Sequence, residues 1–430
     1  MKRKIVITGM GLVSPLGLNV KTTWENLIKG KSGVGYITLF DASTFPVQIA
    51  AEVKGFDESA IALPEGMEHF ASRDTKLCVA AIREAMEDAG IHPDTLDPLR
   101  FGISLGANDE TNTLSHFGNA FDQESIFNAL KHGDLSYFSN PHYMGKIWGV
   151  RRCAHISSEI TSIVFNAQGP VSISSTACAS SAQAIGKAMR IIEHGDAEIM
   201  IAGGCGSFIS EFTVAGFDLL GTLSRNNENP EKACRPFDLK RDGFVLAEGA
   251  GILILEELQH ARERGTTIIA QLTGFGTSSN AYRITDSPPD GRGADQAMSL
   301  ALKDAGLSPE EIDHINAHGT STLLNDRSET KAIKKVFGDA AYRIPITSNK
   351  SMLGHPIASA GVNELIASIL TIKHNIIPPT INYETPDPDC DLDYVPNEPR
   401  ECEVHTVLSN SFAFGGQNAS LIVERYREDV

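Results

Sequence analysis

Cys178 stands where a short run of small and apolar residues gives way to a helical pattern. The run 169–173, Gly-Pro-Val-Ser-Ile, is typical of a strand, and apolar residues with helical spacing follow over 182–192. At a helix N-terminus, free N–H groups and the helix dipole favour a thiolate, so this position suits a nucleophilic cysteine. A buried structural thiol is the alternative interpretation, and this segment alone is compatible with both.

Two histidines follow short apolar runs in the second part of the chain. His318 lies in Asn-Ala-His-Gly-Thr-Ser-Thr, and His355 ends Lys-Ser-Met-Leu-Gly-His, which begins at Lys350. Each histidine stands next to a glycine at an expected strand end, and strand ends are where α/β sheets form their sites. These two segments favour the nucleophile interpretation of Cys178.

The composition is typical of a soluble globular protein. The chain has 430 residues, 41% hydrophobic and 21% charged, which is enough for a large core or two domains. Seven cysteines without a C-x-x-C pair argue against a disulfide framework or a zinc site and predict the cytoplasm. A net charge of −17 argues against nucleic-acid binding. The apolar runs are too short for a membrane span or a signal peptide, so we expect no membrane association.

A weak internal repeat indicates the architecture. Residues 81–97 and 297–313 share a helical pattern that ends in Asp-Ala-Gly and continues into a Pro-containing turn. Thr-Gly-Met-Gly at 8–11 likewise matches Thr-Gly-Phe-Gly at 273–276, each after an apolar run. Amphipathic helices resemble one another by chance, but Asp-Ala-Gly and Pro in register favour a duplication.

The repeat predicts an α/β protein made of two related halves. The N-terminal half, 1–265, contains Cys178 and an irregular insertion near 107–160, and the C-terminal half, 266–430, contains both histidines. Two related halves packed face to face would bring their strand-to-helix turns toward a common centre. The insertion is rich in His, Phe, Tyr and Asn, which suits a pocket wall or a subunit contact.

Seven short motifs carry a resemblance to the β-ketoacyl-acyl-carrier-protein synthases of the thiolase superfamily. They are Val-Ile-Thr-Gly-Met-Gly at 6–11, Thr-Ala-Cys at 176–178, Arg-Pro-Phe-Asp at 235–238, Asp-Gly-Phe-Val at 242–245, His-Gly-Thr-Ser-Thr at 318–322, Lys-Ser-Met-Leu-Gly-His at 350–355 and Asn-Ser-Phe-Ala-Phe-Gly-Gly at 410–416. The chain looks most like the elongating, Cys-His-His type. This resemblance implies a thiolase-like fold in which two duplicated βαβ halves form a layered α-β-α-β-α core.

The resemblance implies an acyltransferase that catalyses a decarboxylative Claisen condensation. Cys178 would take an acyl chain as a thioester, and malonyl-carrier protein would then lose CO2 and lengthen that chain by two carbons. The N–H groups of Cys178 and Phe414 would stabilise the tetrahedral oxyanion, and His318 and His355 would donate to the enolate oxygen. No metal and no organic cofactor is implied, because the carrier protein brings the thioester.

The resemblance also assigns supporting residues. Lys350 is expected to pair with Glu364 and to set the electric field around His355. Phe414 is expected to gate the acyl pocket, with the two following glycines allowing its backbone to move. The residues expected to bind the substrate and its phosphopantetheine arm are Thr320, Thr322, Phe412, Gly415 and Gly416.

Residue types separate the chain from some members of the superfamily. Residues 411–415 lack the second cysteine of thiolases, His355 stands where initiating synthases have Asn, and Cys178 is present where chain-length factors lack the nucleophile. A type II polyketide ketosynthase paired with a chain-length factor stays open, and a non-catalytic partner with this fold is less favoured. Residues 107–110 replace a glycine-rich loop of the family, so acyl length stays undefined.

Acyl carrier protein is the expected partner, and the resemblance implies either a homodimer or a heterodimer with a chain-length-factor-like subunit. Carrier proteins are acidic and so is this chain, so docking is expected to use a local basic patch and to weaken with salt. Each candidate cation is equally compatible with an ordinary solvated charge. The candidate docking residues are Arg73, Lys76, Arg151, Arg152 and Arg225.

Overall fold

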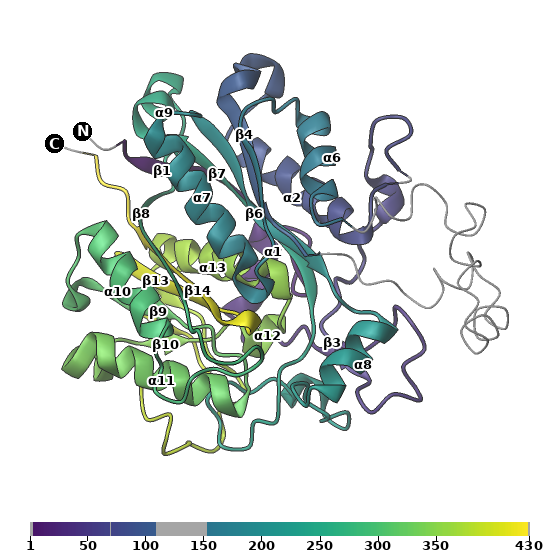
Figure 1. Cartoon of the computed structure of the whole chain (residues 1–430), viewed down its shortest axis with the longest axis vertical. Coiled ribbons are helices and arrows are strands. Elements are labelled where there is room, and N and C mark those ends of the chain that lie inside the picture. Colours follow the sequence, from purple (N-terminus) through teal and green to yellow (C-terminus); the bar gives the residue numbers. More distant parts are fainter. Residues whose placement is uncertain (1–2, 69, 109–152, 429–430) are drawn as a thin grey trace.

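The computed structural model describes residues 3–68, 70–108 and 153–428 (Figure 1). Ten strands form one sheet whose order is β10-β9-β13-β14-β8-β1-β7-β6-β4-β5. Their bounds are β1 (Ile5–Val13), β4 (Phe101–Gly106), β5 (Val171–Ser174), β6 (Ile199–Ser207), β7 (Glu248–Glu257), β8 (Ala270–Ser279), β9 (His314–Asn316), β10 (Ile346–Thr347), β13 (Thr406–Phe412) and β14 (Gln417–Glu424).

The strand order repeats between the two halves of the sheet. From the centre of the sheet outward, the first half runs β1, β7, β6, β4, β5 and the second half runs β8, β14, β13, β9, β10. If the five strands of each half are numbered along the chain, both halves have the same outward order, which is first, fifth, fourth, second and third. The halves join where β1 and β8 pair antiparallel, with Ile5 opposite Leu272 and Ile7 opposite Ala270. The repeated order supports the duplication inferred from the sequence.

Helices form three layers around the two halves of the sheet. Helices α2 (Arg73–Asp88) and α6 (Ile156–Phe165) pack against the first half, and α10 (Ala294–Ala305) packs against the second half. Helices α7 (Ser180–His194) and α13 (Ala360–His374) contact strands of both halves and each other. This arrangement is the predicted α-β-α-β-α core.

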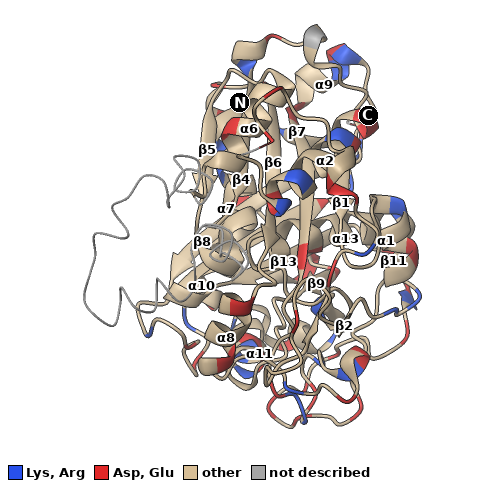
Figure 2. Ribbon diagram, turned by 90° about the vertical axis from the view of Figure 1, so that its right-hand side faces the viewer, with Lys and Arg blue, Asp and Glu red and all other residues tan. Residues whose placement is uncertain are grey.

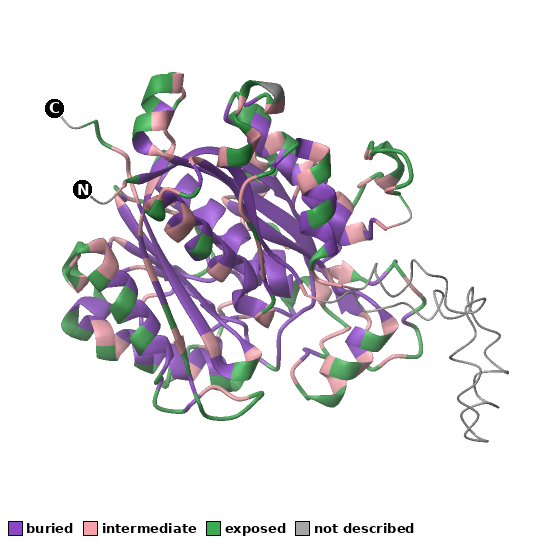
Figure 3. Cartoon of the chain, turned by 45° about the horizontal axis from the view of Figure 1, so that its top comes forward, coloured by how far each residue is buried: buried purple, intermediate pink, exposed green. Residues whose placement is uncertain are grey.

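Burial explains why the central helix α13 is so apolar. All residues of α13 from Ala360 to Ile372 are buried, and Figure 3 shows the central strands and helices in purple with exposed residues on the outer helices. A helix covered by sheets on both sides has no face for charged residues, whereas an outer helix needs only one apolar stripe. Helix α2 accordingly has one buried side and an outer side with the exposed residues Arg83, Glu87 and Asp88.

The remaining helices and strand pairs lie outside the ten-stranded sheet. They are the helices α1 (Val20–Leu27), α8 (Glu211–Leu219), α9 (Leu258–Arg264), α11 (Leu323–Phe337) and α12 (Lys350–Leu353), and the strand pairs β2 (Gly35–Tyr36) with β3 (Ile49–Ala50) and β11 (Ile376–Ile377) with β12 (Arg400–Glu401). No helix in the described part of the chain is long and apolar enough to cross a membrane. No disulfide bond joins any of the seven cysteines within the described part of the chain.

The repeated sequence motifs occupy equivalent places. In the first half, the Met10 N–H donates to the Asp88 carboxylate at 2.9 Å, and in the second half the Phe275 N–H donates to Asp304 at 3.0 Å. Each carboxylate comes from the last turn of the helix that covers the strand. Most of the insertion near 107–160 falls on residues 109–152, which lie outside the described residues.

Candidate functional site

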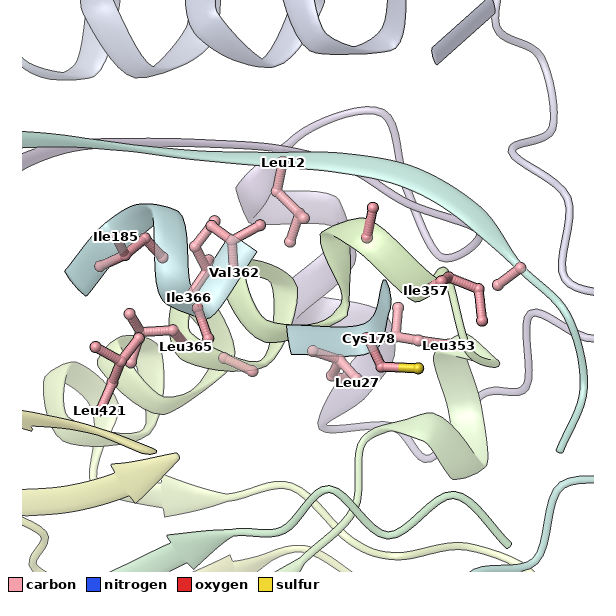
Figure 4. Packing of buried hydrophobic residues seen from close by; sticks show 14 of the residues in the cluster. Leu12, Leu27, Cys178, Ile185, Leu353, Ile357, Val362, Leu365, Ile366 and Leu421 are labelled. Carbon is pink, nitrogen blue, oxygen red and sulfur yellow. The ribbon is translucent and has the colours of Figure 1, made fainter. Parts of the chain in front are cut away.

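Cys178 occupies a tight turn between β5 and α7. The turn residues 177–179 form a short 3-10 helix, and Ala177 before the cysteine has a φ of 47°, in the left-handed region. A non-glycine residue in that region is held there by its surroundings. Figure 4 shows the Cys178 side chain near Leu353 and Ile357, two residues of the second half that belong to the same hydrophobic cluster.

The two histidines come from the second half. His318 follows β9, and His355 follows α12 and precedes the turn into α13. The backbone of His355 is anchored to the first half, because its N–H donates to the Val245 carbonyl at 2.7 Å and its carbonyl accepts from the Ala247 N–H at 3.1 Å. The second histidine is therefore held against the half that carries the cysteine.

The structure brings the three residues together. The Cys178 sulfur lies 3.0 Å from His355 Nε2, and the rings of His318 and His355 are 5.4 Å apart and nearly perpendicular, at 81°. One polar atom from each residue lies within 4.8 Å of the others, and all three side chains are buried. The sequence prediction of a shared centre is thus met by the geometry. The same spacing could hold a soft metal ion.

The pKa of the Cys178 thiol is raised, whereas the sequence analysis expected a lowered pKa that favours the thiolate. Burial raises the pKa of Cys178 to about 11, although the Lys350 charge and the N–H groups of Phe414 and Cys178 lower it. The helix N-terminus was expected to favour a thiolate, but removal of the sulfur from water outweighs these favourable dipoles. The resting group is a thiol that needs a base, and His355 is the base within reach.

Two backbone donors face the cysteine. The N–H groups of Cys178 and Phe414 both interact with the sulfur. Phe414 begins the turn 414–416, in which Gly415 has a φ of 82° and donates its N–H to the Ile284 carbonyl at 2.6 Å. The Phe414 ring stacks on Phe217, with centroids 6.2 Å apart. An oxygen that develops negative charge on a carbonyl bound to Cys178 would lie between two N–H groups.

Lys350 contacts His318, and its charge acts on both histidines. Its Nζ donates to the His318 carbonyl at 2.7 Å, lies 3.3 Å from His318 Nδ1 and pairs with Glu364. The predicted Lys350–Glu364 pair is therefore present. The charge of Lys350 also acts on His355, as expected, because it lowers the pKa of that ring, while the direct contacts of Lys350 are with His318. Because an ammonium group can only donate, His318 Nδ1 accepts and the neutral ring carries its proton on Nε2.

Both histidines are neutral at rest. Burial lowers the pKa of His318 and of His355 well below the usual value, and the Lys350 charge lowers both further. The two rings differ in one respect: within the described structure, His355 Nδ1 has no hydrogen-bond partner. No neighbour fixes the tautomer of His355, so its Nε2 can accept a proton in one step and donate in another.

Glu329 on α11 is a site residue that the sequence analysis missed. Its carboxylate accepts the N–H groups of His318 and Gly319, both at 2.8 Å, and the Asn410 side chain at 3.2 Å. Burial raises the pKa of Glu329 to about 7, and burial likewise raises that of Glu364 to about 7 against the Lys350 charge. Glu329 holds the His318 loop in position. Its place in an ordinary helical pattern gave no signal of this contact.

A cavity leads from the surface to the three residues. Thr320 and Thr322, whose hydroxyls are 2.9 Å apart, lie along its wall with Phe412, and the Phe412 ring is 5.9 Å from that of His318. These three residues, which the resemblance predicts to bind the substrate, therefore line the cavity, and their contact with substrate stays a prediction. Gly415 and Gly416 are not among the described residues that line the cavity; Gly416 packs against Asn280.

The predicted basic docking patch is not free in the described structure. Arg73 pairs with Glu248 at 2.7 Å and with Glu58 at 2.8 Å, and Lys76 pairs with the same Glu58 at 3.0 Å. These cations neutralise nearby carboxylates, and the sequence could not reveal those partners. Arg225 is exposed but pairs with Asp218 at 2.8 Å. Arg151 and Arg152 lie outside the described residues.

Comparison with protein families identifies two adjoining matches. The family described as "Beta-ketoacyl synthase, N-terminal domain" matches residues 2–261, and "Beta-ketoacyl synthase, C-terminal domain" matches residues 269–384. A relative from Coxiella burnetii, named 3-oxoacyl-[acyl-carrier-protein] synthase 2, is 43% identical over 99% of both chains. A relative of the same name from Synechocystis is 40% identical over 99% of both chains.

Solved structures give the same result. A beta-ketoacyl synthase from Burkholderia phymatum superposes with a TM-score of 0.88 at 36% identity, covering 99% of this chain and 100% of the other. A type II polyketide ketosynthase in complex with its acyl-carrier protein superposes with a TM-score of 0.85 at 35% identity and the same coverage. The ishigamide ketosynthase/chain length factor gives 0.86 at 35% identity, again with that coverage.

Proposed function

This chain belongs to the beta-ketoacyl synthase family, and we propose that Cys178, His318 and His355 perform its decarboxylative condensation in the way that follows. The chain is an acyltransferase, a β-ketoacyl-acyl-carrier-protein synthase of fatty-acid or type II polyketide chain elongation. One observation carries the assignment of roles: a nucleophile, two neutral imidazoles and two backbone N–H groups converge on one buried point.

The first step loads the acyl chain onto Cys178. The thiol proton moves to His355 Nε2, 3.0 Å away, while the sulfur attacks the thioester carbonyl of the acyl-carrier protein. The N–H groups of Cys178 and Phe414 stabilise the tetrahedral oxyanion. The bond to the phosphopantetheine sulfur then breaks, and that sulfur leaves with the proton. A thiol with a pKa near 11 stays protonated until a substrate arrives, which limits side reactions.

The second step extends the chain. Malonyl-carrier protein binds, its C–CO2 bond breaks, and the electron pair forms an enolate whose oxygen accepts from the Nε2–H groups of His318 and His355. Lys350 supports this by fixing the His318 tautomer. The enolate carbon attacks the acyl-cysteine carbonyl and the C–S bond breaks. The cysteine thiolate then takes up one proton from solvent, because loss of CO2 from the malonyl carboxylate consumes one proton overall. Neutral donors suit this task, because an enolate is protonated less readily by imidazole than by imidazolium.

The supporting residues keep their predicted tasks in this proposal. Thr320 and Thr322 hydrogen-bond the phosphopantetheine arm, and Phe412 forms part of the wall beside it. Phe414 gates the acyl pocket, and the positive φ angles of Gly415 and Gly416 support that role because such turns can move between conformations without side-chain strain. The reaction uses no metal and no organic cofactor.

The partners are an acyl carrier protein and a second subunit. We propose that the enzyme works in the cytoplasm as a dimer, either with itself or with a chain-length-factor-like subunit. Solved ketosynthases at 35% identity, one with its acyl-carrier protein and one with a chain length factor, support these partners. A non-catalytic role is disfavoured, because Cys178, His318 and His355 are all retained in contact geometry.

The test measures both half-reactions with carrier-bound substrates. Purified enzyme is mixed with labelled acyl-carrier protein to follow label on Cys178, and malonyl-carrier protein is then added to detect the β-ketoacyl product by mass spectrometry. The half-exposed Cys402 is a matched control, so Cys402→Ala should keep both reactions while Cys178→Ala loses both. Product formation without label on Cys178 would contradict the proposal.

A further inference from the structure

Cys178, His318 and His355 have the spacing of a metal site as well as that of a catalytic site. Each residue offers one ligand atom, and the three atoms lie within 4.8 Å of one another on buried side chains. Thiolate sulfur and imidazole nitrogen are ligands that Zn²⁺ prefers, and catalytic zinc sites commonly have three protein ligands and one open position. A metal ion bound here would occupy the nucleophile and both proposed enolate donors, so the proposed reaction needs the site to stay free of metal.

The path to the site does not keep cations out. The cavity that leads to Cys178 is lined by Asp242 and Asp286, and no Lys or Arg of the described residues lines it. Figure 2 shows Lys and Arg interspersed with Asp and Glu along the ribbon, and the chain carries a net charge of −17. A negative net charge raises the local concentration of cations. Exclusion of a metal ion must therefore come from the site itself.

Lys350 is the feature of the site that opposes a metal ion. Its Nζ lies 3.3 Å from His318 Nδ1, donates to the His318 carbonyl at 2.7 Å and pairs with Glu364. An ammonium group can only donate, so the lone pair of Nδ1 points to Lys350 and the ring proton is on Nε2. A protonated ring nitrogen has no lone pair for a metal ion, so this tautomer of His318 cannot be a ligand through Nε2.

The other tautomer of His318 is unfavourable while Lys350 is present. With the proton on Nδ1, two donors would face each other across 3.3 Å in a place that is buried from water, and a buried donor without an acceptor is costly. His355 has no such restraint, because its Nδ1 has no hydrogen-bond partner within the described structure. Of the three ligands, His318 is therefore the one that Lys350 withholds from a metal ion.

We propose that Lys350 is a positioning residue that keeps soft divalent metal ions out of the catalytic site, because it holds His318 in a tautomer that cannot bind them. Without Lys350, Cys178, His318 and His355 form a site for Zn²⁺ or Co²⁺. When the ion binds, the thiol proton passes to the buffer, the sulfur and two ring nitrogens donate electron pairs to the ion, and no group is oxidised or reduced. This inference goes beyond the proposed function, since it concerns the enzyme without substrate.

The test titrates Co²⁺ into purified enzyme without substrate, because Co²⁺ occupies zinc sites and a Co²⁺–thiolate bond has a charge-transfer band in the near ultraviolet. Lys350→Met should bind a single Co²⁺ ion and show this band. At the Co²⁺ concentration that saturates the variant, the wild type should show no band. The Kd for Zn²⁺, measured by competition with a chromophoric chelator, should be about 100-fold lower in the variant, since hydrogen-bond partners of ligands change metal affinity by about 10-fold to 100-fold.

The control variants separate the tautomer effect from damage to the fold. Lys350→Met leaves the buried Glu364 without its partner, so Lys350→Met combined with Glu364→Gln is a second variant that should bind Co²⁺ in the same way. Lys350→Arg retains a cation that can only donate, and it should exclude the ion as the wild type does. Lys29→Met is the matched surface control, because Lys29 is exposed and does not line the cavity, and it should behave as the wild type. Circular dichroism measures whether each variant is folded.

Three results would overturn the inference. They are a wild type that shows the same band at the same Co²⁺ concentration, folded Lys350→Met variants that bind Zn²⁺ no more tightly than wild type, and a band that persists when Cys178→Ala is added to Lys350→Met. None of them would affect the proposed function, which labelling of Cys178 and formation of the β-ketoacyl product test separately. Failure of those two reactions would likewise leave the metal titration unaffected, because the titration uses no substrate.

Discussion

The two halves of the molecule share a scaffold but carry different chemistry. Each half has the same strand order, and in each a helix carboxylate binds the N–H between two glycines of its first strand. Those glycines are required in both halves, because a Cβ on Gly9 would meet the Ala85 carbonyl at 2.1 Å and one on Gly274 would meet the Ala301 carbonyl at 2.6 Å. Both halves therefore keep the same close contact between their first strand and the helix that covers it.

The turns that lead into α7 and α13 show the difference. Ala177 and Ile357 both have a φ of 47°, and each is followed by a 3-10 turn and then by a buried central helix. The residue after the strained position is Cys178 in the first half and Ala358 in the second. The turn of the second half therefore has the same strained backbone as the turn of the first half, although no nucleophile follows Ile357.

The contacts of the two turns explain why both are kept. The turn 177–179 packs against β13 and β14 of the second half, whereas the turn 357–359 packs against β6 and β7 of the first half, and the two turns touch each other. The strain is balanced by packing across the interface between the halves. This geometry belongs to the fold, and catalysis was added by placing a sulfur on one side and imidazoles on the other.

The largest expected effect concerns the nucleophile. Cys178→Ala should lower condensation by more than about 1,000-fold, because the acyl-enzyme cannot form. The equivalent change in the second half, Ala358→Cys in the Cys178→Ala background, should not restore it, since the N–H groups of Cys178 and Phe414 face the first turn. Product formation by this double variant, measured by mass spectrometry, would show that the two turns are chemically interchangeable.

The two histidines should separate the half-reactions. His318→Ala should slow decarboxylation about 100-fold to 1,000-fold, the cost of one oxyanion donor, and leave acylation of Cys178 within about tenfold. His355→Ala should impair both steps, because His355 is the histidine whose Nε2 lies 3.0 Å from the sulfur. Labelled acyl-carrier protein reports acylation and released CO2 reports decarboxylation. Equal effects of the two variants on acylation would contradict the distinct roles.

The pH dependence of alkylation tests the buried state of the thiol. Because burial raises the pKa of Cys178 to about 11, the thiolate fraction and the rate of labelling by iodoacetamide should rise about tenfold per pH unit up to about pH 10. Lys350→Met removes a charge that lowers this pKa, so labelling should become slower at every pH. A rate that levels off near pH 7 would mean that a thiolate is already present at rest.

The smallest expected effect concerns Asp88 and Asp304, which occupy equivalent places in the two halves. Asp304 also pairs with Arg190 at 2.6 Å, so Asp304→Asn should lower the free energy of unfolding by about 1 kcal/mol at pH 7. Asp88 has no ion pair within the described structure, and burial raises its pKa. Its contribution to stability is present below the unfolded pKa and is lost as pH rises through the folded pKa.

Asp88→Asn should therefore remove that pH dependence and leave stability at pH 7 unchanged or slightly higher, since the amide oxygen still accepts the Met10 N–H. Urea unfolding at pH 4 and pH 7 measures both variants. A larger loss in Asp88→Asn than in Asp304→Asn would reverse the comparison.

The sequence predicted those features that short segments encode. The turn at Cys178, the strand end before His318 and the repeated Asp-Ala-Gly each have a local pattern, and the resemblance placed Lys350 beside Glu364. The strand end expected at His355 was wrong, because this residue follows the short helix α12. Features set by distant contacts were missed or predicted wrongly.

Three examples show why. Glu329 binds the His318 loop from another helix, Arg73 finds Glu248 across 175 positions of sequence, and the raised pKa of Cys178 follows from burial by the second half. A single sequence shows residue types and spacing. It does not show which charged side chain is paired with an opposite charge or how far a site is buried from water. These quantities depend on the packing of both halves.

The anchoring of His355 to residues 245–247 has a consequence for biosynthesis. A ribosome completes the first half before the second, so the segment with Cys178 exists for a time without its histidines and without the strands that cover it. During that interval we expect the cysteine to be a solvated thiol with an ordinary acidity, open to oxidants and electrophiles in the cell. Folding of the second half ends this exposure and assembles the catalytic groups in the same event, so protection and activation of the cysteine arrive together.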